Sequence, residues 1–160
     1  MDTTGRERAG AAATARESET SRPPRVSRLY SLAAVLSLAG LADAIYLTVE
    51  HLSGRSVRCT VTSGCSEVLS SPYATVGGYP LALFGAFAYF TAFSLATLAA
   101  FGSRRAGNLF ALVVALMFAA SLWLLYLQAF VLHAFCQYCL LSAAITTLLA
   151  CIAVARRVTK

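Results

Sequence analysis

The chain has 160 residues, of which 58% are hydrophobic and only 12% are charged, against roughly 25% charged in an average soluble domain. This length fits one domain, and the composition excludes an ordinary soluble protein. The net charge of +6 would suit a nucleic-acid partner in a soluble protein. Here we expect none, because the basic residues flank long apolar segments.

Four apolar segments approach or exceed the roughly 17 to 25 residues that a helix needs to cross a bilayer. They cover residues 30–49, 81–101, 109–132 and 138–155. A soluble bundle would need a polar face on each helix, and these segments have none. The sequence therefore predicts an all-α membrane protein, a four-transmembrane-helix bundle over residues 29–157 that is capped by a cysteine loop at about residues 50–79.

The two ends of the chain differ from these segments. Residues 1–28 mix Arg, Glu, Ser, Thr, Ala and Pro with almost no large apolar side chain, and we expect a disordered tail there. The apolar run that follows is too long for the core of a signal peptide, so we expect the first span to be retained. Residues 158–160 form a second short tail.

The basic residues predict the orientation in the membrane. All but two of the 13 lie before the first span, between the second and third, or after the fourth. Basic segments stay in the cytoplasm, so both termini and the 102–108 loop are expected to be cytoplasmic. The 50–79 loop and the turn at 133–137 are then expected on the opposite, oxidising side of the membrane.

Five cysteines are the strongest chemical signal. Cys59 and Cys65 form a C-x5-C pair in the outer loop, and Cys136 and Cys139 form a C-x2-C pair at the outer end of the last span. Both pairs fall on the side where disulfides persist. Cys151 lies deep in the last span, and we expect it to be a small buried apolar residue.

The two pairs allow three interpretations. A four-cysteine metal site does not explain a pair at a lipid boundary without other polar ligands, so we expect no metal. Structural disulfides are not needed by a bundle in lipid, and Cys136 with Cys139 would close too small a loop to constrain the chain. A redox relay is favoured, because a C-x-x-C at a helix N-terminus stabilises the thiolate that attacks disulfides.

The segment CTVTSGCSEVLSSPYATVGGYPLALFGAFAY, residues 59–89, followed by FCQYC at 135–139, resembles the bacterial form of the vitamin K epoxide reductase family. The resemblance covers about residues 29–157. It implies a four-helix bundle around a membrane quinone (menaquinone, ubiquinone or vitamin K type) in a bacterial cytoplasmic membrane. The 160 residues contain no fused thioredoxin-like domain, so a separate thioredoxin-fold, DsbA-like partner outside the cytoplasm is expected.

The resemblance also implies an order of electron transfer. The partner presents its reduced thiols to Cys59 and Cys65, Cys65 exchanges with Cys136, and Cys139 reduces the quinone. The chain would thus be a quinone-linked disulfide oxidoreductase that supports disulfide formation. Two alternatives remain open: a vitamin K epoxide or quinone reductase proper, and a non-enzymatic tetraspan protein with structural disulfides.

Further residues match the family one by one. Ser71 stands where the family keeps a serine in the cap, and Phe84 and Tyr89 match a Phe-Gly and a tyrosine of its second helix, which implies contacts with the quinone. Leu81 and Ala143 replace an asparagine and a tyrosine of the animal enzymes. Both replacements favour plain quinone reduction over epoxide reduction.

Several polar and aromatic residues are candidates from their position alone. Asp43 lies within the first span, where inserting a carboxylate costs about 2.5 to 3.5 kcal/mol on insertion scales. It should therefore face the interior of the bundle. There it either relays protons or has its hydrogen bonds satisfied by neighbouring side chains. Gln128 and Tyr138 are candidate quinone contacts. Two histidines, His51 and His133, lie near the outer boundary of the membrane. An aromatic slot for the quinone would be formed by Trp123, Tyr126, Phe130 and Tyr138.

Overall fold

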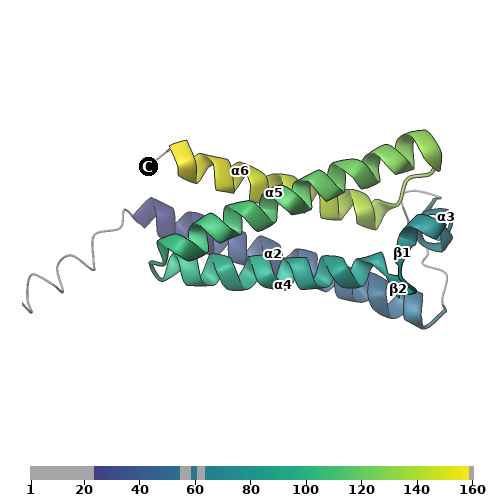
Figure 1. Ribbon diagram of the computed structural model, residues 1–160, viewed down its shortest axis with the longest axis horizontal. Helices are drawn as coiled ribbons and strands as arrows, with labels where there is room; N and C mark the ends of the chain where they lie inside the picture. The colour runs from purple at the N-terminus through teal and green to yellow at the C-terminus, as the bar shows by residue number, and fades with distance from the viewer. Residues whose placement is uncertain (1–23, 55–58, 61–63, 159–160) are drawn as a thin grey trace, which may run out of the picture.

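The computed structural model describes residues 24–54, 59–60 and 64–158. Four long helices run side by side along the molecule (Figure 1), and each is long and apolar enough to cross a membrane. The predicted all-α bundle with four spans is thereby confirmed. The helices are α2 (Pro24–Leu52), α4 (Leu81–Ala100), α5 (Arg104–Tyr126) and α6 (Gln137–Val158).

The first helix begins earlier than the sequence predicts. Helix α2 starts at Pro24, inside the segment 1–28 that was expected to be disordered, so this expectation is wrong for residues 24–28. The reason is packing: Val26 and Leu29 already lie against the hydrophobic core, which supports helix before the long apolar run begins. The rest of that tail, residues 1–23, and residues 159–160 lie outside the described residues.

Small residues bring α2 and α4 into close contact. On α4, Ala92, Ala96 and Ala99 are fully buried, and α2 packs more extensively against α4 than against any other helix. At Gly40 of α2, an added Cβ would overlap with the ring of Tyr89. Without a hydrophobic driving force between helices in lipid, such close backbone contact is what holds them together.

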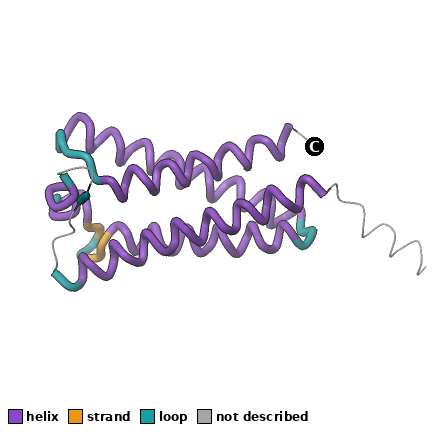
Figure 2. The backbone as a smooth tube through the Cα atoms, turned by 180° about the vertical axis from the view of Figure 1, so that it is seen from behind, coloured by secondary structure: helices purple, strands orange, loops and turns teal. Residues whose placement is uncertain are grey.

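A compact cap covers one end of the bundle. It consists of the short helix α3 (Cys65–Ser70), the 3-10 turn η1 (Pro72–Ala74) and the antiparallel strands β1 (Thr75–Val76) and β2 (Tyr79–Pro80). Gly77 and Gly78 join the strands with φ of 60° and 85°, a left-handed conformation that glycine adopts without strain. The cap leads directly into α4, and Figure 2 shows it from behind.

The connection between α5 and α6 lies at the same end as the cap (Figure 1). Helix α5 continues into the π-helical turn η2 (Leu127–Val131), and His133, with φ of 50°, reverses the chain toward α6. The N-terminus of α2, the α4–α5 turn and the C-terminus of α6 lie at the opposite end. The loop and the head of α6, distant in sequence, are therefore neighbours in space.

Candidate active site

The loop cysteines form a disulfide. Cys59 and Cys65 are joined with their Cα atoms 5.7 Å apart, and Cys65, the first residue of α3, is only 1% exposed. The amide N–H of Val68 donates to the carbonyl of Gly64 at 3.0 Å and starts the helix. A Cβ at Gly64 would lie 2.8 Å from the backbone nitrogen of Phe135, so the loop approaches the segment before α6 as closely as glycine permits.

The second pair stands at the head of α6 with both thiols free. Cys136 immediately precedes the helix, and its carbonyl accepts from the N–H of Leu140 at 3.0 Å. Its own N–H donates to Oε1 of Gln128 at 2.9 Å. Gln128, on η2, is only 2% exposed, so a buried side chain from the end of α5 holds the backbone of Cys136 in place.

The environment of Cys136 favours its thiolate. A hydrogen bond from the side chain of Cys139, aided by backbone hydrogen bonds from Cys139 and Tyr138, lowers the pKa of Cys136 to about 6, although burial acts in the opposite direction. The thiolate is the nucleophile in disulfide exchange. Cys136 is therefore mostly in the reactive form at neutral pH.

This pKa predicts a pH dependence. A lowered pKa means that the thiolate of Cys136 persists down to about pH 6 and is protonated below it. In Cys139→Ala, the main hydrogen-bond donor is gone, and the titration should move upward toward the usual thiol value of about 8.5. Thiolate ultraviolet absorbance of the reduced protein, corrected with Cys136→Ser, measures both titrations. An unchanged midpoint in Cys139→Ala would contradict the assigned cause.

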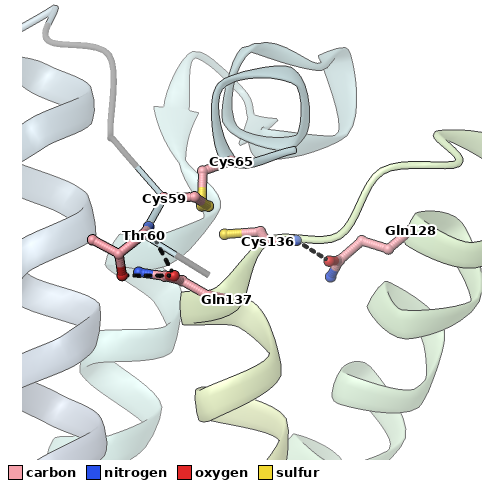
Figure 3. The surroundings of a disulfide bond; sticks show 6 residues. All are labelled: Cys59, Thr60, Cys65, Gln128, Cys136 and Gln137. Carbon is pink, nitrogen blue, oxygen red and sulfur yellow. Dashed lines mark hydrogen bonds between the residues drawn. A yellow bond between two sulfur atoms is a disulfide. The ribbon is translucent and has the colours of Figure 1, made fainter. Parts of the chain in front are cut away.

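The two pairs face each other. Cys65 and Cys136 belong to one buried cluster, and Cys59 and Cys139 pack against it. In Figure 3 the sulfur of Cys136 points toward the disulfide of the loop. The arrangement places an oxidised pair directly beside a reduced pair.

A cavity of about 140 Å³ lies next to the second pair, between the four long helices and the cap. Its wall is mostly apolar and includes Cys139 but not Cys136. An engineered apolar cavity of about 150 Å³ accepts a benzene ring, so this space fits a ring-sized group. The two cysteines at the head of α6 therefore have different neighbours: Cys136 faces the loop disulfide, and Cys139 faces the cavity.

Comparison with known families gives a match for this arrangement. The model of the vitamin K epoxide reductase family matches residues 31–154, which is most of the chain. The chain belongs to the vitamin K epoxide reductase family. No curated protein matches it. As a member of this helical membrane family, the protein is an integral membrane oxidoreductase of the quinone-linked thiol class.

Polar groups of this family member reach the cavity from α2, α4, η2 and α6. The hydroxyl of Tyr89 lies 2.8 Å from Oγ of Ser142 and 3.0 Å from Oγ1 of Thr146, which fixes the tyrosine against α6. Oδ2 of Asp43 is buried and has no hydrogen-bond partner among the described residues. Asp43, Tyr89, Ser142 and Gln128 all line the cavity, so it is apolar with a few polar side chains.

Ser71 supports the cysteine loop. Its Oγ donates to the carbonyl of Val68 at 2.7 Å, and this bond closes the C-terminal end of α3. The side chain is buried and also lies on the cavity wall. Ser71 therefore connects the helix that begins with Cys65 to the cavity, in line with its expected place in the cap.

Two of the four predicted quinone contacts are not at the cavity. Tyr89 and Gln128 line it, whereas Phe84 and Tyr138 do not. Phe84 is 49% exposed, because the neighbouring Gly85 takes the cavity-facing position and one residue turns a helix by about 100°. The ring of Tyr138 instead packs against Tyr46, with ring centroids 5.4 Å apart.

Other expectations also need correction. The ring of Tyr126 stacks on Trp123 and lies tilted against Phe130. All three are on the outer surface of the bundle, with at least half of each side chain exposed, so they form no slot around Cys139. Cys151 is exposed rather than buried. In a membrane bundle, apolar surface faces lipid, so an apolar residue deep in a span need not be in the core.

His51 lines the cavity, and His133 does not; the backbone of His133 forms the turn into α6. Sequence reasoning missed Ser142 and the pair Thr60 and Gln137. Ser142 follows Cys139 by three residues, which places both on one helix face, and this spacing was a usable signal. Nothing in the sequence relates Thr60 to Gln137, which lie 77 residues apart.

Proposed function

We propose that the protein reoxidises a thioredoxin-fold, DsbA-like partner through Cys59 and Cys65, and passes the electrons through Cys136 and Cys139 to a membrane quinone. The observation that carries this proposal is the placement of the second pair. Cys136 points to the loop disulfide, and Cys139 lies on the wall of the cavity. A pair that contacts both a disulfide and a ring-sized cavity is suited to connect them.

The first step is an exchange with the partner. Two thiols of the partner become a disulfide, while the Cys59–Cys65 disulfide becomes two thiols, so electrons and protons balance. The loop pair then reduces the Cys136–Cys139 disulfide in the same way and returns to its oxidised form. In the proposed cycle, this transfer leaves the loop pair as a disulfide and the second pair as thiols.

We assign the cavity to the head group of a quinone of the menaquinone, ubiquinone or vitamin K type. A quinone accepts two electrons and two protons, and this redox chemistry is its own contribution. The chain supplies an apolar wall and the side-chain N–H groups of Gln128 as donors to a carbonyl oxygen. The hydroxyl of Tyr89 lines the same wall and donates to the carbonyl of Ser142 at 3.0 Å. Asp43 has a buried oxygen without a partner among the described residues, and we assign it the delivery of a proton at that oxygen.

The same proposal includes the location. With the basic residues in the cytoplasm, the cysteine end of the bundle faces the extracytoplasmic side of a bacterial cytoplasmic membrane, where an oxidising partner works. The surrounding lipid covers the exposed apolar side chains of the four helices, and it also supplies the quinone laterally. Both termini then lie in the cytoplasm.

Thiol trapping tests the proposal. The purified protein is mixed with a reduced thioredoxin-fold carrier, with and without quinone, and free thiols are alkylated and counted on a gel. We expect both pairs to accumulate as thiols without quinone and to return to disulfides when quinone is added. Pairs that stay oxidised with reduced carrier and no quinone would show that the cysteines are structural and that the protein is a tetraspan protein without this activity.

A further inference from the structure

We propose that Gln137 is a positioning residue that docks the loop disulfide against Cys136. Gln137 directly follows Cys136 in the C-x-x-C motif. This inference rests on the proposed relay and adds to it a device for bringing the two pairs together. Gln137 has no part in the electron transfer itself. It acts through Thr60, the residue that follows Cys59.

Two hydrogen bonds carry the inference. Oε1 of Gln137 accepts from the backbone N–H of Thr60 at 3.1 Å and from its Oγ1 at 3.3 Å. Figure 3 shows this contact beside the disulfide and beside Cys136. Thr60 is the immediate neighbour of Cys59, and Gln137 is the immediate neighbour of Cys136. The contact therefore joins the two pairs through residues directly beside the cysteines.

The loop is held on the other flank of the disulfide by packing. Gly64 precedes Cys65, and a Cβ there would lie 2.8 Å from the backbone nitrogen of Phe135 and 2.9 Å from Cβ of Ala134. This contact is steric and mostly with backbone atoms, and it limits how near the loop can come. Among the described residues, Gln137 makes the side-chain hydrogen bonds that join the loop to the head of α6.

The position of Thr60 makes the contact reversible. Thr60 is exposed and Gln137 is partly buried, so when the loop moves away water can replace the bonds and offset part of their loss. A loop that must also present Cys59 to a soluble partner needs such an attachment. A covalent or deeply buried attachment of the loop would hold the disulfide permanently against Cys136.

The exchange that this docking serves is sensitive to position. The thiolate of Cys65 attacks the sulfur of Cys136 in the Cys136–Cys139 disulfide, so the Cys65–Cys136 bond forms and the electron pair leaves on Cys139. The thiolate of Cys59 then attacks Cys65, which restores the loop disulfide and releases Cys136 as a thiolate. Each attack needs the incoming sulfur in line with the bond that breaks, and holding reactants in such geometry can raise rates by many orders of magnitude.

A cross-linking experiment tests the docking without any quinone. In a full-length Cys59→Ser, Cys139→Ser, Cys151→Ala background, only Cys65 and Cys136 remain, and diamide oxidises them by accepting two electrons and two protons. We expect Gln137→Met, which keeps the length but has no oxygen acceptor, to slow formation of the Cys65–Cys136 disulfide by roughly tenfold, as expected for the loss of one or two hydrogen bonds. Gln137→Glu keeps the acceptor and should stay near the parent rate. Equal rates in Gln137→Met and parent would overturn the proposal.

A turnover experiment separates docking from a local effect on the C-x-x-C motif. With a reduced thioredoxin-fold carrier, Gln137→Met should lower the kcat of quinone reduction severalfold, whereas Thr91→Val, which removes an exposed threonine hydroxyl from α4, should not. In a Cys59→Ser, Cys65→Ser background driven by dithiothreitol, the effect of Gln137→Met should disappear. Equal losses in both backgrounds would mean that Gln137 acts on the helix pair alone, and the docking role would be wrong. If the parent reduces no quinone, the proposed function fails, and the cross-linking rates still decide the docking role.

Discussion

Replacing Cys139 by serine is expected to abolish quinone reduction, lowering its rate by at least roughly a thousandfold, as losses of a reacting group commonly do. Among the four paired cysteines, Cys139 is the one on the wall of the cavity. Serine has nearly the same size but cannot form a disulfide, so the electrons of Cys136 have no exit. The measurement is the absorbance change of a water-soluble short-chain quinone with dithiothreitol as the electron donor.

The control is Cys151→Ala. Cys151 is an exposed cysteine of the same helix, outside the wall of the cavity, and we expect this variant to keep the parent rate. In Cys139→Ser, the exchange between Cys65 and Cys136 remains possible, so a mixed disulfide between loop and helix should accumulate. Normal quinone reduction by Cys139→Ser would remove the basis of the proposed relay.

Replacing Asp43 by asparagine is expected to lower quinone reduction by roughly 100-fold, within the usual contribution of a general acid or base. Asparagine has the shape of the carboxylate but does not exchange a proton in this range. Because Oδ2 of Asp43 is buried without a partner among the described residues, its charge is costly. The variant should therefore be at least as stable as the parent, and its thermal unfolding in detergent should show this.

The opposite directions of these two effects distinguish a proton carrier from a structural residue. If Asp43 had a structural role, the Asp43→Asn protein would lose stability together with activity. Glu67→Gln, at an exposed carboxylate of α3, provides the control and should change neither when dithiothreitol is the donor. Parent-like quinone reduction by Asp43→Asn would show that protons reach the site by another route.

The sequence alone determined the number of spans and the positions of the two cysteine pairs. Helix formation and membrane insertion depend on the length and polarity of local segments, so four helices follow from composition along the chain. The C-x5-C and C-x-x-C spacings are equally local. Helix ends also depend on packing: α2 begins at Pro24 because residues such as Val26 gain contacts with the core.

Which side chains face the cavity was decided only by the tertiary structure. A span that is apolar on all sides carries no signal for its inner face, and this is why Cys151 was expected to be buried and is exposed. A buried residue in lipid need not be more apolar than an exposed one. Neither Phe84 nor Tyr138 lines the cavity, and their contact with a quinone stays a prediction.

The contacts that join the two cysteine pairs also required the fold. Gln128 holds the backbone of Cys136, and Gln137 accepts from Thr60 across 77 residues of sequence. Hydrogen bonds of this kind depend on where a loop and a helix end meet in space, which no periodicity or spacing encodes. The chemistry of the protein was readable from its cysteines, whereas the geometry that aims one pair at the other and Cys139 at the cavity arises from packing between distant segments.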